Sequence, residues 1–149
     1  MNLKDVRWEQ RFENFEKAFS FFKRACKKKN YSPLEASGLV KAFEFTFELA
    51  WKTLKDYLEM TGIDAKFPRD VIKQSYNTQL IEDGHRWMLM LEKRNELSHT
   101  YDQKEADKAV AIIKSKYFSA VEQVYKKLKQ RIDEQKKAGI KKRRSGSDS

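Results

Sequence analysis

The sequence predicts an all-α fold, an antiparallel up-and-down bundle of four main helices and one short helix. Three observations predict it: seven glycines and prolines in 149 residues, a charged fraction of 36%, and apolar residues at helical spacing in every long segment. A chain of this length can form one domain with its own core. We expect that domain over residues 1–136 and a basic, disordered tail over residues 137–149.

The first helix is expected from Leu3 to Lys28. Its apolar residues are spaced by four and three positions, so they form one stripe along an α-helix. The residues of this stripe are Trp8, Phe12, Phe15, Phe19 and Phe22. Asn30 and Tyr31 should end the helix.

The second helix has the clearest start and end signals in the chain. Ser32 fits an N-cap, Pro33 fits the first helical position, and Glu35 completes a capping box. The helix should end just before Gly62, because glycine can adopt the left-handed turn that follows many helices. Its centre, residues 43–51, is apolar on nearly every side. This predicts burial on more than one face, or a place in a subunit interface.

Three further helices are expected after the second one. They should cover residues 68–81, residues 85–98 after Asp83-Gly84, and residues 104–136. The short loops between them suit an antiparallel bundle. No apolar stretch is long enough to span a membrane. The single cysteine, Cys26, favours a packing role and a reducing compartment, so a cytoplasmic location is expected.

The net charge of +10 is unevenly distributed. One dense basic run covers residues 23–29, and another covers residues 126–144. Such runs attract polyanions, of which nucleic acid is the most common. The alternative interpretation is that they are solvated helix faces, and for the tail we favour this alternative.

The fourth helix changes character towards its end. Trp87 and Leu91 begin an apolar stripe, but the stripe continues through Arg94, Asn95 and Ser98. Burying such side chains without partners is unfavourable. The change therefore indicates either a cleft or partner surface at this end, or a helix that simply emerges into solvent. The residues alone leave both interpretations open.

The spacing of Arg94 and His99 restricts how they can act together. Five residues apart, they point about 140° from each other on an ideal helix, whereas Asn95 and His99, four apart, share a face. The helix must therefore end near His99, or a second copy in a two-fold dimer must supply the missing half.

The chemistry that needs this set is cleavage of RNA without a metal ion. A histidine with a near-neutral pKa can take the proton of a ribose 2′-hydroxyl or give one to the leaving oxygen. The Arg94 guanidinium can stabilise the charge that develops on the phosphate. Asn95 can orient the histidine or hold the phosphate.

Metal or cofactor chemistry fits this sequence less well. His85 and His99 lie in different local contexts, without the spacing of a zinc site. His85 is expected to be a surface residue. Glu44 and Glu48 share a helix face, but Lys52 and Lys55 just after them favour ion pairs over a metal site. No glycine-rich phosphate loop is present, so we expect no metal and no cofactor.

Residues 94–101, Arg-Asn-Glu-Leu-Ser-His-Thr-Tyr, resemble the signature of HEPN-domain toxins: an arginine, four residues, a histidine, one residue and a tyrosine. A wider similarity links the chain to nucleotidyltransferase substrate-binding proteins. It is carried by residues 43–52, residues 68–72 and the segment from Trp87 to Asn95. The resemblance extends over residues 6–128.

This resemblance implies a helical bundle, usually a homodimer, similar to the substrate-binding domain of kanamycin nucleotidyltransferase. It implies that the chain is the toxin of a toxin–antitoxin pair and acts as a metal-independent endoribonuclease on RNA. The implied antitoxin is a small nucleotidyltransferase encoded nearby. In the toxin branch, Arg94 and His99 match the ribonuclease residues, and Asn95 matches an auxiliary polar position. Tyr101 matches the tyrosine that the partner adenylylates to silence the toxin. The alternative is a non-catalytic subunit that holds substrate for the nucleotidyltransferase.

Overall fold

The computed structural model describes residues 2–147, and the side chains of residues 2–140. The helices in this range are α1 (Leu3–Ala25), α2 (Pro33–Met60), α3 (Pro68–Asn77), α4 (Gly84–Lys93), α5 (Gln103–Ile112) and α6 (Phe118–Ser147). A 3₁₀ turn, η1 (Arg94–Ser98), follows α4, and a π turn, η2 (Ile113–Tyr117), joins α5 to α6. Because α5, η2 and α6 form one continuous rod, the described chain has five helical rods. The predicted all-α fold is confirmed.

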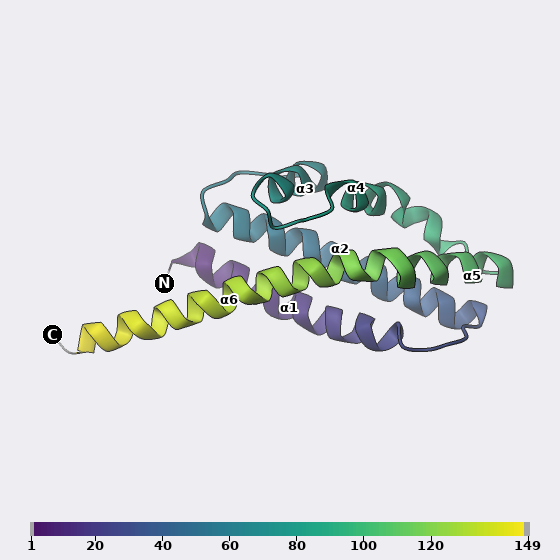
Figure 1. The fold of residues 1–149 in the computed structure, drawn as a ribbon, viewed down its shortest axis with the longest axis horizontal. Helices are drawn as coiled ribbons and strands as arrows, with labels where there is room; N and C mark the ends of the chain where they lie inside the picture. The colour runs from purple at the N-terminus through teal and green to yellow at the C-terminus, as the bar shows by residue number, and fades with distance from the viewer. Residues whose placement is uncertain (1, 148–149) are drawn as a thin grey trace.

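The long helices run side by side along the molecule (Figure 1). α1 and α2 pack against each other as an antiparallel pair, and the α5–α6 rod lies against both. The shorter helices α3 and α4 lie along another edge of α2, and η1 returns the chain towards the start of α5. α2 therefore contacts nearly every other element of the bundle.

The start of α2 is formed as the sequence predicts. The Ser32 side chain accepts a hydrogen bond from the Glu35 backbone N–H, and the Glu35 carboxylate accepts one from the Ser32 N–H. Pro33 occupies the first turn, where its missing N–H has no partner to lose. At the other end Gly62 has a φ of 96°, in the left-handed region that favours glycine.

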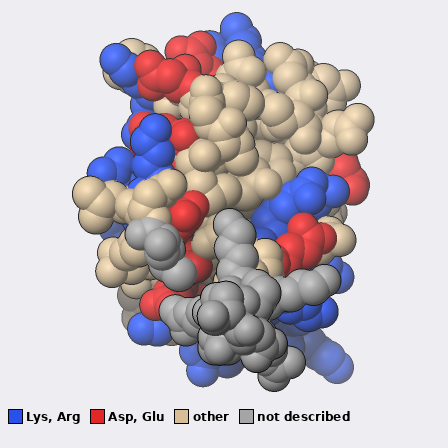
Figure 2. All heavy atoms as spheres, turned by 90° about the vertical axis from the view of Figure 1, so that its left-hand side faces the viewer, with Lys and Arg blue, Asp and Glu red and all other residues tan. Residues whose placement is uncertain are grey.

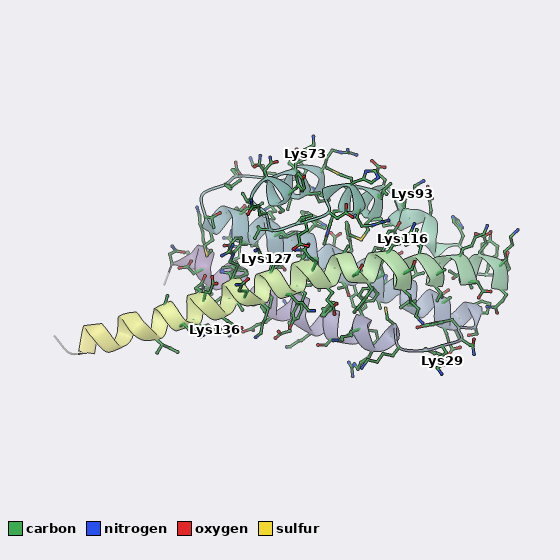
Figure 3. The ribbon with its side chains drawn as sticks, viewed as in Figure 1. Lys29, Lys73, Lys93, Lys116, Lys127 and Lys136 are labelled. Carbon is green, nitrogen blue, oxygen red and sulfur yellow. The ribbon has the colours of Figure 1, made fainter. Side chains whose placement is uncertain are left out.

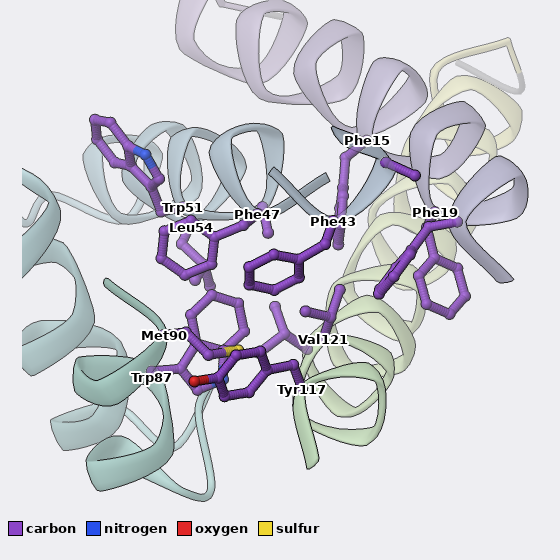
Figure 4. Packing of buried hydrophobic residues seen from close by; sticks show 14 of the residues in the cluster. Phe15, Phe19, Phe43, Phe47, Trp51, Leu54, Trp87, Met90, Tyr117 and Val121 are labelled. Atoms are coloured by element: carbon purple, nitrogen blue, oxygen red, sulfur yellow. The ribbon is translucent and has the colours of Figure 1, made fainter. Parts of the chain in front are cut away.

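An aromatic core fills the space between α1, α2, α4 and the α5–α6 rod (Figure 4). The Phe43 ring stacks on Tyr117 with centroids 5.2 Å apart, and the Phe47 ring stacks on Trp87 at 5.5 Å. All four side chains are buried. Burying a side chain of this size contributes about 1.5–3 kcal/mol relative to exposing it. The predicted burial of the α2 centre is confirmed, as is that of the apolar stripe of α1.

Several helix ends differ from the sequence prediction. α1 ends at Ala25, before the expected Lys28, and the Ala25 carbonyl accepts a hydrogen bond from the Tyr31 hydroxyl. α3 ends at Asn77 and not at residue 81, since Gln79 has a φ of 66° and leaves the helical region.

α6 continues to Ser147, past the expected helix end at residue 136. The segment beyond residue 136 has no proline and is rich in lysine and arginine, which are good helix formers. Residues 148–149 of the predicted tail lie outside the described residues. The division into a domain over 1–136 and a tail over 137–149 stays a prediction. No helix in the described range is both long and apolar enough to cross a membrane.

Candidate functional site

The segment that carries the predicted site residues is a tight turn between two helices. The α-helical pattern of α4 ends at Lys93, and η1 continues it as a 3₁₀ turn to Ser98. His99 has φ −87° and ψ 76°, outside the helical region. Three residues later Asp102 starts α5, because its side chain accepts a hydrogen bond from the Glu105 backbone N–H at 2.9 Å. The helix thus ends just before His99, which is one of the two arrangements that the spacing left open.

Contacts to α2, to the loop before it and to the core hold this turn in place. Thr100 is buried, and its hydroxyl forms a hydrogen bond with the Ser37 hydroxyl of α2. The Gln103 side-chain amide donates to the Tyr31 carbonyl at 2.9 Å. Leu97 is also buried and anchors η1 in the core. These contacts fix the backbone on both sides of His99, so its exposed ring stands on an ordered turn.

Arg94 lies against the centre of α2. Its guanidinium is 3.6 Å from the Glu48 carboxylate and stands over the Phe47 ring, 5.8 Å from the ring centroid. Glu48 is itself held in place, because the Trp51 indole donates to its Oε2 at 2.9 Å and the Lys52 ammonium lies 3.4 Å from its Oε1. The ion pair and the ring contact together orient the guanidinium in this structure.

His99 and Tyr101 lie next to each other on the solvent side of the turn. Their ring centroids are 6.2 Å apart, with an interplanar angle of 84°. Both side chains are exposed, Tyr101 to 79%. An exposed imidazole and an exposed phenol at this distance can be covered by one bound molecule.

The structure brings the predicted residues together in two groups, and not in one. His99 adjoins Tyr101, whereas Arg94 adjoins Glu48 and has no hydrogen bond or ion pair to His99 within the described part of the chain. Asn95 is exposed, and its carbonyl accepts a hydrogen bond from the Ser98 hydroxyl at 2.9 Å. The ideal α-helix assumed for the spacing of Asn95 and His99 is absent here, because η1 has three residues per turn and His99 has left the helix.

Sequence reasoning missed Glu48 as a partner of Arg94. The spacing to Lys52 predicted a surface ion pair, and this pair is confirmed. Lys55, expected to pair in the same group, instead lies 3.0 Å from Glu59. No sequence signal pointed from α2 to Arg94, since the contact arises where α4 ends against α2.

The fold also bears on two other candidate chemistries. Burial raises the pKa of the Cys26 thiol to about 11, so the thiol is neutral at ordinary pH and serves packing. Over the residues whose side chains are described, no three His, Cys, Asp or Glu residues form a group that could hold a metal ion.

Comparison with known proteins gives a consistent set of relatives. The family described as "Nucleotidyltransferase substrate binding protein like" matches residues 10–130, a range that includes α2, η1 and the turn after it. The "Probable ribonuclease HepT" of Haemophilus influenzae is 33% identical over 75 residues, which cover 47% of this chain and 51% of that protein. The chain thus spans about half the length of this curated relative.

Two solved structures share the fold. A crystal structure of a protein from Thermus thermophilus matches with a TM-score of 0.68 and 30% identity, and the match covers 76% of this chain and 98% of that one. HI0074 of Haemophilus influenzae, reported to reveal the fold of a substrate binding domain of a nucleotidyltransferase, matches with a TM-score of 0.58. It is 23% identical, and the match covers 84% of this chain and 98% of that one.

Proposed function

This chain belongs to the nucleotidyltransferase substrate binding protein like family, and we propose that it is an RNA-cleaving toxin paired with a small nucleotidyltransferase that silences it. One observation carries the proposal. An exposed histidine, His99, stands on an ordered turn that begins with a fixed arginine, Arg94, and ends beside an exposed tyrosine, Tyr101. The ribonuclease name of the curated relative supports the same activity.

The proposed reaction needs a base, an acid and a cation at one phosphate. His99 takes the proton of a ribose 2′-hydroxyl while that oxygen attacks the adjacent phosphorus. The bond from phosphorus to the 5′-oxygen breaks, and the leaving oxygen takes up a proton. The products are a 2′,3′-cyclic phosphate and a 5′-hydroxyl. Arg94 stabilises the additional negative charge on the phosphate oxygens, and Asn95 serves as an auxiliary polar contact.

A second copy of the chain would complete this site. In one chain Arg94 lies against Glu48, while His99 lies beyond the end of η1 on the exposed turn. A two-fold dimer that places two such turns face to face would bring the arginine of one copy to the histidine of the other. We therefore propose a homodimer, in which the second His99 can supply the proton to the leaving oxygen.

Tyr101 is the proposed site of silencing. Its phenol oxygen would attack the α-phosphate of ATP bound to the nucleotidyltransferase, with release of pyrophosphate and loss of the phenol proton. The exposure of Tyr101, 79%, leaves it accessible to another protein. An AMP group there would stand beside the His99 ring and place a negative charge where RNA must bind.

The decisive experiment compares two exposed histidines. The chain is expressed without the nucleotidyltransferase, and growth and RNA integrity are followed for the unchanged protein, His99→Ala and His85→Ala. We expect the unchanged protein and His85→Ala to stop growth and cleave RNA, in the presence of EDTA as well. His99→Ala should lose at least about 10²-fold in cleavage rate, the usual contribution of general acid–base catalysis. Equal activity of both variants would refute the proposal.

A non-catalytic substrate-binding role is the second candidate. It is favoured by the family description and by the fold reported for HI0074, both of which refer to substrate binding and not to cleavage. The two functions differ in a simple assay. If the purified chain leaves RNA intact, and the nucleotidyltransferase modifies a third molecule only in its presence, the binding role replaces the toxin. An AMP added to Tyr101 on co-expression, and absent from Tyr101→Phe, supports the toxin.

A further inference from the structure

The basic run of residues 23–29 has almost no charge partners in the fold. It contains five lysines and arginines and no carboxylate. Within the described residues only Lys28 forms an ion pair, with Glu35. Lys23, Lys27 and Lys29 are exposed and carry no ion pair in the same range. This run therefore presents unneutralised positive charge at the end of α1 and in the loop that follows it.

Hydrogen bonds to neighbouring elements hold the loop in place. The Tyr31 hydroxyl donates to the Ala25 carbonyl at 2.5 Å, and the Lys114 ammonium donates to the Lys28 carbonyl at 2.6 Å. The same ammonium lies over the Tyr31 ring, 5.2 Å from its centroid. With the Gln103 amide on the Tyr31 carbonyl, the loop is tied to α1, α5 and η2. The lysines of the loop thus stand on a fixed backbone, and Lys114 adds a sixth cation next to them.

This loop adjoins the turn that carries the candidate site. Gln103, which holds the loop, follows Tyr101 by two residues. Ser37, which holds the turn through Thr100, lies five residues along α2 from the cap Ser32. The turn and the loop are thus joined through the starts of α2 and α5. Lysines on the loop add positive electrostatic potential to this side of the molecule.

The cleft between the loop and α5 is a poor site for an anion. That cleft, about 560 Å³ in volume, is lined by Lys28 and Lys29, but also by the carboxylates of Glu35 and Asp107. Lys23 and Lys27 are not part of this lining, are exposed and carry no ion pair within the described residues. A bound polyanion is therefore expected to contact Lys23, Lys27 and the exposed Lys29 and to continue towards the turn at His99.

We propose that the basic loop, defined as residues 23–29 (the last three residues of α1 and the start of the loop after it), binds the sugar-phosphate backbone of RNA. The phosphate that is cleaved in this RNA would lie at the 94–101 turn. This inference rests on the proposed ribonuclease function and adds the surface that holds the substrate. Lysines without fixed partners suit a backbone contact that does not read sequence. Each phosphate neutralised on a single strand releases counterions and adds about 0.7 to the salt slope of binding.

The chain supplies a matched set of control lysines. Lys66, Lys73 and Lys136 are also exposed and lack ion pairs in the described range, but they lie elsewhere: in the loop before α3, on α3 and on α6. Figure 3 shows Lys29 at the loop between α1 and α2, with Lys136 towards the opposite end of the molecule. That opposite end, seen in Figure 2, carries basic and acidic side chains next to each other around an uncharged area. Reversing either set of three lysines changes the net charge equally.

The test measures binding of a labelled, short single-stranded RNA to the full chain with His99→Ala, so that the RNA is not cut. In this background, Lys23, Lys27 and Lys29 are changed together to Glu, and the control set is Lys66, Lys73 and Lys136 to Glu. We expect at least tenfold weaker binding for the loop variant and a salt slope lower by about 2, from three lost contacts. The control set should weaken binding by less than about threefold. Circular dichroism checks that each variant folds.

Equal weakening by the two sets would overturn the proposal, because net charge alone would then explain it. Unchanged RNA affinity with lost capture of the co-expressed nucleotidyltransferase would overturn it too, since the loop would then be a protein contact. If the triple variant does not fold, Lys27→Gln combined with Lys29→Gln is compared with Lys66→Gln combined with Lys73→Gln, which changes the net charge by the same amount and leaves α1 intact. Cleavage is measured separately with His99 intact, so absence of cleavage counts against the proposed function and not against RNA binding by the loop.

Discussion

The centre of α2 and the turn after α4 are neighbours, but the first is buried and apolar and the second is exposed and polar. Phe47 of α2 contacts both the core and the turn. On one side its ring stacks on Trp87 in the core at 5.5 Å, and the Arg94 guanidinium stands 5.8 Å from its centroid. The core side chains are buried, while Asn95, His99 and Tyr101 are exposed. The aromatic core thus supplies a rigid support for the turn. The exposed polar groups contribute little to stability and can serve binding or chemistry.

The largest expected effect is on the core side of this comparison. Phe43 is fully buried and contacts the rings of Phe22, Phe47 and Tyr117, so Phe43→Ala leaves a cavity among aromatic side chains. We expect a loss of about 3–5 kcal/mol in the free energy of unfolding, measured by urea denaturation. Phe67→Ala is the control, because Phe67 is 67% exposed; its effect should stay within about 0.5 kcal/mol. Similar losses for both variants would contradict the packing described.

A smaller effect is expected at the border between the two regions. Glu48→Gln keeps the size of the side chain and an oxygen for the Trp51 indole, but removes the charge that faces Arg94. Stability should change by less than about 1 kcal/mol, because the pair is partly exposed. RNA cleavage should fall about tenfold or more as the guanidinium loses its orientation. Glu44→Gln, one turn earlier on α2, is the control, and equal cleavage by both variants would count against a positioning role.

The smallest expected effect lies at the start of α2, next to the basic loop. The Lys28 ammonium, together with the Ser32 backbone N–H, lowers the pKa of the Glu35 carboxyl from 4.5 to about 2. Since the folded state favours the charged form, Glu35 stabilises the fold above pH 4.5 and loses this contribution as the pH falls towards 2. The free energy of unfolding is measured for the unchanged chain and for Glu35→Gln between about pH 6 and pH 2, and the difference between them should shrink as the pH falls. A difference that is the same at every pH would contradict the lowered pKa of Glu35.

The sequence by itself determined where the helices lie and which residues of the two long N-terminal helices are buried. The capping box of Ser32 and Glu35, the left-handed Gly62 and the apolar stripe of α1 all appear where the pattern placed them. These features depend on interactions between residues a few positions apart, which is why the sequence reveals them. The end of α6 at Ser147 was not foreseen, because a basic segment without apolar periodicity carries no local signal for its end.

Only the tertiary structure decided how the site residues are arranged. The change from α-helix to 3₁₀ turn at Arg94, the Glu48 carboxylate beside its guanidinium and the Ser37 hydroxyl against Thr100 all arise where α4, η1 and α2 meet. These partners are far apart in the chain, and packing of the whole bundle sets their distances. A spacing rule for one ideal helix therefore grouped Asn95 with His99, whereas the folded turn places His99 beside Tyr101 and the Arg94 side chain against α2.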